Sequence, residues 1–240
     1  MKTIQKQPEP AYLMQHWLSA YATFDNLQEK EQLKQDLLEE QGYLCCYCMR
    51  RIRIDNMKVE HRQSQSKYPA QRLIYKNLFA ACDGGEGKPR NKQHCDTHKG
   101  DDDIVIDPGS VGLCEANIQY NFHTGIICSH RNDWNHDLNC VLNLNTDDLR
   151  EARKYAVQAF KDRMWKKYPS SDWPRQVLMK TRDELLKSGE KLEPYCQVVI
   201  AYIEHKLGIG PYTHHSGCPK KPECQDEKPQ DGDGNQIGEK

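Results

Sequence analysis

The chain has 240 residues and a formal net charge of -1, with 29% of its residues charged and 37% in the hydrophobic class. No stretch approaches the roughly 18–20 consecutive apolar residues that a membrane-spanning helix needs, and the opening MKTIQK lacks the apolar run of a signal peptide. We therefore expect a cytoplasmic protein. Because the overall charge is close to neutral, any basic surface for nucleic acid must be local.

The first expected elements are helices. Apolar residues recur at helical spacing from residue 11 to residue 41, and residues 22–26 interrupt the pattern. We therefore expect two helices in an N-terminal helical region that spans residues 1–42.

Residues 43–145 differ in character, because Cys, His, Gly and Asn become frequent and long apolar periodicity is lost. Two short alternating runs, residues 51–54 and 57–60, flank Asp55-Asn56 and predict a β-hairpin. Further along we expect a short helix at residues 70–77, an irregular loop at 83–90, and strands at 118–122 and 125–127. This region is the expected core of an α+β protein.

Three more helices are expected in a C-terminal helical region, residues 146–207. They lie at residues 147–168, 173–188 and 194–207, and Asp147 or Asp148 is placed to cap the first of them. The last segment, residues 208–240, is rich in Pro, Gly, Asp and Lys, and we expect it to be mostly disordered.

The eleven cysteines indicate a metal site. An odd number in a chain without a secretion signal argues against a disulfide framework and for metal ligation. Cys45 and Cys48 have the C-x2-C spacing that places two thiolates on one Zn²⁺ from a tight turn. Cys82 and Cys95 lie on either side of a Gly-rich loop that can bring them together. The sequence therefore predicts a structural zinc site with four cysteine ligands.

Other cysteines and histidines leave alternatives open. Cys46 and His94 are competing ligands, since each is next to one of the four. Four residues near the C-terminus could bind a second metal ion: His214, His215, Cys218 and Cys224. We favour the alternative that they occur by chance in a disordered tail. The cysteines without ligand spacing are assigned to packing; they are Cys114, Cys128, Cys140 and Cys196.

A second group of residues has the chemistry that phosphodiester hydrolysis requires. His61 can act as a general base, because its unperturbed pKa lies near neutrality. Asn77 can accept the ring N–H of this histidine and so fix its tautomer. Glu60 and Asp96 offer hard oxygen ligands for Mg²⁺ or Mn²⁺, and Lys99 can contact a phosphate oxygen.

The order of these elements resembles the HNH endonuclease superfamily, whose ββα-metal (treble-clef-like) core consists of a hairpin, a helix and one metal ion. The matching segments are Glu60-His61 for the acid–His element, Asn77-Leu78 for the Asn element, and residues 95–99 (CDTHK) for the closing Cys-His-x-x-Lys element. Asp96 stands where the last metal-binding His usually lies, and His98 is the alternative ligand. The spacing between Cys82 and Cys95 is also longer than in the common form.

A closer resemblance covers roughly residues 1–207 and is to the HNH subunit of Septu-type anti-phage systems, the PtuB family, whose homologues include retron-associated HNH proteins. The segments that carry it are residues 44–48 (LCCYC), Glu60-His61 with Tyr68-Pro69, residues 76–78 (KNL), residues 95–100 (CDTHKG), and residues 141–145 (VLNLN) with Arg150. The resemblance implies an effector nuclease that works beside an ABC-type, PtuA-like ATPase. In retron systems it further implies a reverse transcriptase and its RNA–DNA product as partners.

Two functions from different classes are therefore expected. One is a metal-dependent HNH endonuclease that cleaves DNA or a host RNA such as tRNA; the other is a non-catalytic zinc module that binds nucleic acid or a partner protein. A binding module has no need of a base and a hard-cation site together, so we favour the enzyme. The terminal helices are expected to build a docking surface for the ATPase, with the alternative that their aromatic residues form the core; the candidate anchors are Trp17, Tyr21, Trp165 and Trp173.

Overall fold

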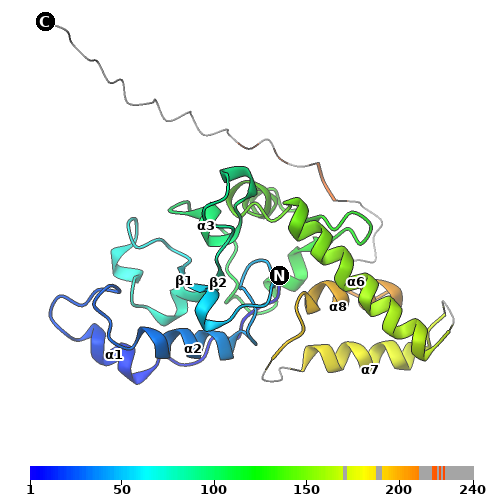
Figure 1. The fold of residues 1–240 in the computed structure, drawn as a ribbon, viewed down its shortest axis with the longest axis horizontal. Helices are drawn as coiled ribbons and strands as arrows, with labels where there is room; N and C mark the ends of the chain where they lie inside the picture. The colour runs from blue at the N-terminus through cyan, green and yellow to red at the C-terminus, as the bar shows by residue number, and fades with distance from the viewer. Residues whose placement is uncertain (170–171, 188–190, 211–217, 221, 223, 225–240) are drawn as a thin grey trace, which may run out of the picture.

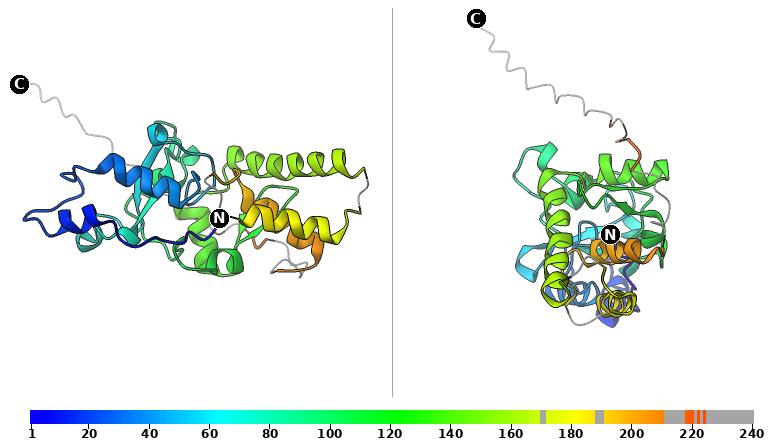
Figure 2. Two further views of the ribbon diagram at one scale, coloured as in Figure 1. Left: turned by 90° about the horizontal axis from the view of Figure 1, so that it is seen from below. Right: turned by 90° about the vertical axis from the view of Figure 1, so that its right-hand side faces the viewer.

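The computed structural model describes residues 1–169, 172–187, 191–210, 218–220, 222 and 224. It is a mixed α+β structure with two small antiparallel sheets. In Figure 1 the helices α1 and α2 and the strands β1 and β2 lie on one side, and the helices α6, α7 and α8 lie on the other. Figure 2 shows the same division from two further directions, with the N-terminus between the two halves.

Two helices form the N-terminal region, as predicted. They are α1 (Ala11–Trp17) and α2 (Lys30–Glu40). The apolar positions of α2 are fully buried against the sheet, and they are Leu33, Leu37 and Leu38. Just after α2, the side chain of Gln41 donates to the carbonyl of Ala80 and accepts from its N–H, both at 2.8 Å. The amide of Gln41 thus satisfies the backbone N–H and carbonyl of Ala80 at the edge of β2 that no other described strand covers.

The main sheet is a two-stranded hairpin of β1 (Met57–His61) and β2 (Leu78–Cys82), with Met57 opposite Cys82 and His61 opposite Leu78. The predicted hairpin between residues 51–54 and 57–60 is wrong. Residues Ile54–Asn56 form a 3-10 turn instead of a hairpin loop, and Arg51 bridges to Leu44. Local alternation could not reveal the true pairing, because all of β2 is buried and shows no alternation.

The segments around the hairpin are short. The predicted helix at residues 70–77 is two separate 3-10 turns, Pro69–Gln71 and Tyr75–Asn77. After a further 3-10 turn, Arg90–Lys92, come the helices α3 (Cys95–Lys99), α4 (Leu113–Asn117) and α5 (Asn132–His136), and a π-helical turn at Asp137–Val141. The two strands expected between residues 118 and 127 are confirmed as β3 (Gln119–Tyr120) and β4 (Ile127–Cys128).

The three C-terminal helices are also confirmed, as α6 (Asp147–Lys167), α7 (Arg175–Leu186) and α8 (Cys196–Leu207). Helix α8 is buried along most of its length and packs against both α6 and α7. The capping prediction for α6 is wrong, because the cap residue is Thr146 and its side chain makes no capping bond. Asp147 and Asp148 lie in the first turn, where their negative charge interacts favourably with the positive end of the helix dipole.

Two disulfides correct the assignment of Cys128 and Cys140 to packing. Cys128 is bonded to Cys218 and Cys140 to Cys224, and the other seven cysteines are free and buried. The bonded residues are 90 and 84 positions apart, so no local spacing could predict them. Cys114 and Cys196 do serve packing, as expected.

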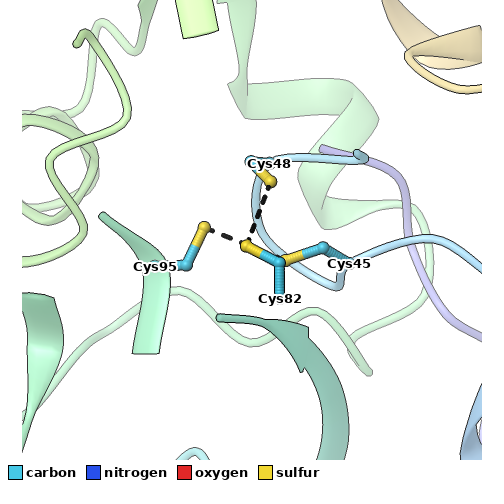
Figure 3. Close-up of side chains that lie close together, drawn as sticks. All are labelled: Cys45, Cys48, Cys82 and Cys95. Carbon is cyan, nitrogen blue, oxygen red and sulfur yellow. Dashed lines mark hydrogen bonds between the residues drawn. The ribbon is translucent and has the colours of Figure 1, made fainter. Parts of the chain in front are cut away.

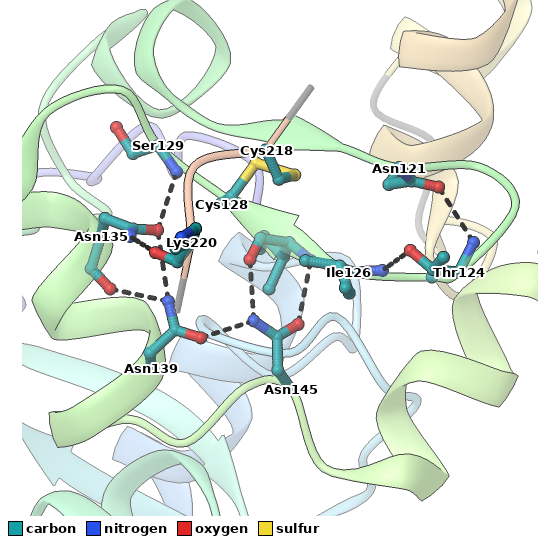
Figure 4. Close-up of a disulfide and its surroundings, with 12 residues drawn as sticks. Asn121, Thr124, Ile126, Cys128, Ser129, Asn135, Asn139, Asn145, Cys218 and Lys220 are labelled. Carbon is teal, nitrogen blue, oxygen red and sulfur yellow. Dashed lines mark hydrogen bonds between the residues drawn. A yellow bond between two sulfur atoms is a disulfide. The ribbon is translucent and has the colours of Figure 1, made fainter. Parts of the chain in front are cut away.

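Within the segment after residue 208, which is expected to be mostly disordered, Cys218 and Cys224 are described, and each is held by one of these disulfides. Figure 4 shows the first disulfide beside Asn135, whose side-chain amide donates to the carbonyl of Lys220 at 3.5 Å. His214 and His215, the other expected ligands of a second metal, lie outside the described residues, as does most of the expected disordered tail. In the described part of the chain, no helix combines the length and the apolar character that crossing a membrane requires.

Candidate functional site

Four buried cysteine side chains meet where the hairpin, the preceding turn and α3 converge. The Sγ atoms of Cys45, Cys48, Cys82 and Cys95 all lie within 4.8 Å of one another, and Figure 3 shows them pointing toward a common centre. The Cys45–Cys95 and Cys48–Cys82 sulfur distances are 3.8 and 3.7 Å. A tetrahedral ion with metal–sulfur bonds of about 2.3 Å requires sulfur separations of about 3.8 Å. The predicted four-cysteine set can therefore hold a metal ion such as zinc.

Local backbone structure brings the first two ligands together. The N–H of Cys45 donates to the carbonyl of Arg50 at 2.9 Å, and the N–H of Met49 donates back to Cys45 at 3.1 Å. Met49, directly after the C-x2-C segment, has a φ of 63°, which lets the chain reverse direction there. The resulting tight turn presents both sulfur atoms on one side.

A glycine closes the loop between the other two ligands. The N–H of His94 donates to the carbonyl of Gly84 at 2.9 Å, so the loop is narrow at its base. Gly84 has a φ of 60°, and a Cβ atom at this position would lie 2.3 Å from the carbonyl oxygen of His94. Only glycine fits there. This contact lets Cys82, at the end of β2, and Cys95, at the start of α3, approach each other.

The VLNLN segment, residues 141–145, holds the start of α3 from the other side. The N–H of Cys95 donates to the carbonyl of Leu142 at 2.9 Å, and the side-chain amide of Asn143 donates to the carbonyl of Gln93 at 2.8 Å. Nδ1 of His98 donates to the carbonyl of Val141 at 2.8 Å. This segment was singled out in the sequence, but its contact with α3 was not predicted.

The two competing ligands lie beside the metal centre rather than in it. Nδ1 of His94 is 3.2 Å from the sulfur of Cys95 and 3.9 Å from that of Cys82. His94 can therefore donate a hydrogen bond to a ligating thiolate. Cys46 is buried, and its backbone N–H donates to Ala80 on β2 at 3.0 Å. Neither belongs to the group of mutually close ligand atoms.

Next to the cysteines lies a buried acid cluster at the end of β1. The Glu60 carboxylate accepts a hydrogen bond from the Tyr47 hydroxyl at 2.6 Å and lies 3.2 Å from Nζ of Lys99. Burial, followed by a hydrogen bond and charge repulsion from Asp96, raises the pKa of Glu60 well above its usual value. Two of the predicted site carboxylates, Glu60 and Asp96, are thus neighbours. Tyr47, which sequence reasoning missed, lies inside the C-x2-C turn.

His61 is held in a defined tautomer, but not by the predicted residue. Its Nε2 donates to the backbone carbonyl of Arg72 at 3.0 Å, and its ring packs edge-on against Phe24 with centroids 4.6 Å apart. With the proton on Nε2, Nδ1 of a neutral ring is the basic atom. Burial lowers the pKa of His61 to about 4, so the ring is neutral near pH 7.

The expected hydrogen bond from the His61 ring to Asn77 is therefore wrong. The Asn77 side chain is buried and accepts from the N–H of Gln63 at 2.8 Å. It also donates to the carbonyls of Gln63 and Gln71, at 3.0 and 3.1 Å. Asn77 thus holds together the two ends of the segment between β1 and the 3-10 turn at Pro69–Gln71. That segment carries Arg72 to its contact with His61.

Lys99 faces inward rather than toward a substrate. Its Nζ donates to the carbonyls of His61 and Gly100 at 3.2 and 3.0 Å, and its side chain is 1% exposed. This structure therefore does not place Lys99 where a phosphate from solution can reach it. Among the described residues, only the four cysteines form a group of three or more close metal-ligating side chains, so Glu60 and Asp96 stand as a pair.

The four candidate docking aromatics divide into two kinds. Trp17 and Trp165 are each 56% exposed, and Tyr21 is 92% exposed. Trp173 instead packs edge-on against the buried Phe160 with centroids 5.7 Å apart, so it belongs to the helical core.

No protein-family model matches the chain, and no curated protein matches it.

Proposed function

We propose that this protein is a metal-dependent HNH endonuclease whose hairpin and helix are joined by a structural Zn²⁺ on Cys45, Cys48, Cys82 and Cys95. The observation that carries the proposal is the position of Glu60 and His61 at the end of β1, beside β2, whose Cys82 joins Cys95 of α3 in the cysteine cluster; α3 also bears Asp96. The hairpin, the helix and the acid–histidine pair beside them support the proposal, together with the order of the sequence motifs, which resembles that of ββα-metal nucleases.

The general base is His61. Its neutral ring keeps the proton on Nε2, which faces a carbonyl, and so presents Nδ1 as the atom that can take a proton from water. The low pKa that burial gives this ring means that it need not lose a proton before acting. Phe24 and the carbonyl of Arg72 fix the plane of the ring from two sides.

Glu60 and Asp96 would hold Mg²⁺ or Mn²⁺. Two neighbouring carboxylates, in which Asp96 raises the pKa of Glu60, are a suitable donor pair for a hard cation, which removes their repulsion. Such an ion supplies stabilisation of negative charge on the phosphate undergoing attack. Nδ1 of His98 donates to the carbonyl of Val141, a bond that a metal-ligating histidine also commonly makes, so His98 remains the alternative ligand on α3. Asp96, which acts on the neighbouring carboxylate of Glu60, is the ligand that we propose.

One observation favours the second candidate function, a non-catalytic zinc module. Glu60 is already paired with Tyr47 and Lys99 in a site that is 1% exposed. In a binding module, this ion pair would serve the fold alone and no divalent ion would enter. The two functions therefore differ in whether Glu60 exchanges Lys99 for a metal ion.

An activity assay on the full chain separates them. The protein is incubated with Mn²⁺ or Mg²⁺ and with plasmid, single-stranded DNA or total tRNA, beside His61→Ala and the control His123→Ala, an exposed histidine after β3. We expect His61→Ala to lower the cleavage rate by about 10²–10⁴ and His123→Ala to leave it unchanged. Equal cleavage by His61→Ala and the wild type would refute the mechanism; no cleavage of any substrate would favour the binding module.

The setting we propose is an anti-phage defence complex, in which the nuclease works beside an ABC-type, PtuA-like ATPase and, in a retron system, a reverse transcriptase with its RNA–DNA product. With Trp173 in the core, the exposed Trp165 on α6 is the candidate anchor for the ATPase in the C-terminal helices. Loss of co-purification in Trp165→Ala is the expected result.

A further inference from the structure

A cavity of about 450 Å³, in the range of small-molecule sites, lies between the end of α1 and the segment that follows β1. Its walls come from two segments: the end of α1 and the turn after it, with Trp17 and Tyr21, and the segment after β1, with Pro69 and Arg72. The cavity thus combines two aromatic rings with a guanidinium group.

Arg72 connects this cavity to His61. The backbone carbonyl of Arg72 accepts the Nε2 hydrogen of His61 at 3.0 Å, while its side chain lines the cavity. Its Nη2 atom donates to the carbonyl of Ala22 at 2.6 Å, which joins the two walls. Phe24, two residues further along the same wall segment, packs on the His61 ring. The cavity is therefore connected to the Nε2 side of the His61 ring through Arg72, which belongs to both.

The aromatic wall is held in place although it contributes little to the core. Tyr21 is 92% exposed and has a φ of 65°, a left-handed conformation that is strained for a residue other than glycine. The side chain of Asn26 donates to the carbonyl of Tyr21 at 3.0 Å, and the N–H of Ala22 donates to Ser19 at 3.3 Å. These bonds keep an exposed aromatic residue in a strained conformation that burial does not explain.

We infer that this cavity binds an unstacked base of the nucleic-acid strand that enters the active site, with the base stacked on Trp17 or Tyr21. Aromatic faces accept any base, and a guanidinium adds a cation–π or phosphate contact. The connection of the cavity to His61 through Arg72 favours a substrate strand as the ligand. A protein partner could dock at a site with no connection to the general base His61. The inference rests on the proposed nuclease function and gives that function a single-stranded or locally opened substrate.

The test measures binding apart from cleavage. In the His61→Ala background, the full chain is titrated into short fluorescein-labelled single strands of DNA and of RNA, and into the matching duplexes, without added divalent ions. The variants are Trp17→Ala, Tyr21→Ala and the control Trp165→Ala, because Trp165 has the same 56% exposure as Trp17 but lies on α6. Trp17→Phe tests whether a smaller aromatic face is sufficient.

We expect Trp17→Ala and Tyr21→Ala each to weaken single-strand binding by about 5- to 150-fold, which is the range for loss of one base–aromatic stack. Trp165→Ala should bind as the parent does, and Trp17→Phe should retain most of the affinity. A strand with 2-aminopurine at one position should show quenching that Trp17→Ala reduces. Because Trp17 and Tyr21 are exposed, these changes should leave the circular dichroism spectrum unchanged.

Unchanged single-strand affinity in both alanine variants would overturn the inference and assign the aromatic pair to a protein partner. A loss that is equal in Trp165→Ala would also overturn it, since the effect would then be unspecific. Failure of the nuclease proposal would be distinguishable. If the chain with His61 intact cleaves nothing in the presence of Mn²⁺ but still binds single strands through Trp17, the cavity is a binding site without catalysis.

Discussion

Nζ of Lys99 lies 3.2 Å from the carboxylate of Glu60, and both side chains are only 1% exposed. Removing one partner of such a pair leaves the other charge buried without compensation, which typically costs about 3–5 kcal/mol. We predict that Lys99→Ala lowers the free energy of unfolding by about that amount, measured by urea denaturation. Lys76→Ala, at an exposed lysine, is the control and should have little effect.

The double variant Lys99→Met with Glu60→Gln tests whether the uncompensated charge causes this loss of stability. It removes both charges, so it should be more stable than Lys99→Ala alone. A Lys99→Ala protein as stable as the wild type would mean that this lysine is free to reach solvent, as the sequence pattern had suggested.

The second prediction concerns Asn77. Its side chain satisfies three backbone groups of residues 63 and 71, and each buried group left without a partner costs about 1–3 kcal/mol. Asn77→Ala should therefore lower stability and also slow cleavage, because the segment that carries Arg72 to His61 loosens. Asn77→Asp keeps only the acceptor for Gln63 and should not rescue stability. Lost activity at full stability would instead place Asn77 in contact with the substrate.

The third prediction identifies the zinc ligands. We expect one Zn²⁺ per chain by elemental analysis, lost in Cys45→Ser but retained in its neighbour Cys46→Ser. Binding of structural zinc can contribute on the order of 10 kcal/mol to folding, so Cys45→Ser should also fail to give a cooperative unfolding transition. Zinc retained in Cys45→Ser and lost in Cys46→Ser would transfer the ligand role to the second cysteine.

The fourth prediction separates Asp96 from His98 as the ligand on α3. Loss of even an outer-shell partner typically costs about 10- to 100-fold in metal affinity. Asp96→Ala should therefore raise the Mn²⁺ concentration required for half-maximal cleavage at least that much, while His98→Ala should shift it little. The opposite pattern would move the ligand to His98 and leave the nuclease proposal intact.

The fifth prediction concerns the disulfides. Alkylation of the unreduced, denatured protein should modify seven of the eleven cysteines, and all eleven after reduction. A bridge of this kind typically contributes about 2–4 kcal/mol, so the double variant Cys128→Ser with Cys140→Ser should unfold at lower urea. Modification of all eleven cysteines without reductant would show that the bridges are absent.

Local patterns predicted the elements whose signals are local. The C-x2-C turn and the helices at residues 147–167 and 196–207 follow from spacing within a few residues. The pairing of β1 with β2 was missed because the strand Leu78–Cys82 is buried on both faces, and such a run does not reveal its partner.

The candidate site was predictable in composition but not in contacts. The sequence placed Glu60, His61 and Asp96 together through the order of the motifs. It could not reveal that a backbone carbonyl, that of Arg72, orients the histidine, because every residue has a carbonyl. The inward turn of Lys99 was equally hidden, since only the folded hairpin buries Glu60 beside it.

The two disulfides have a consequence for the integrity of the chain. The bridges Cys128–Cys218 and Cys140–Cys224 interleave, and each begins before α6 and ends after α8. If a protease cuts the backbone once between residues 141 and 217, the two fragments therefore stay joined through the disulfides. The fragments stay covalently linked at high effective concentration, so a nicked molecule can keep its C-terminal helices packed on the domain that carries His61.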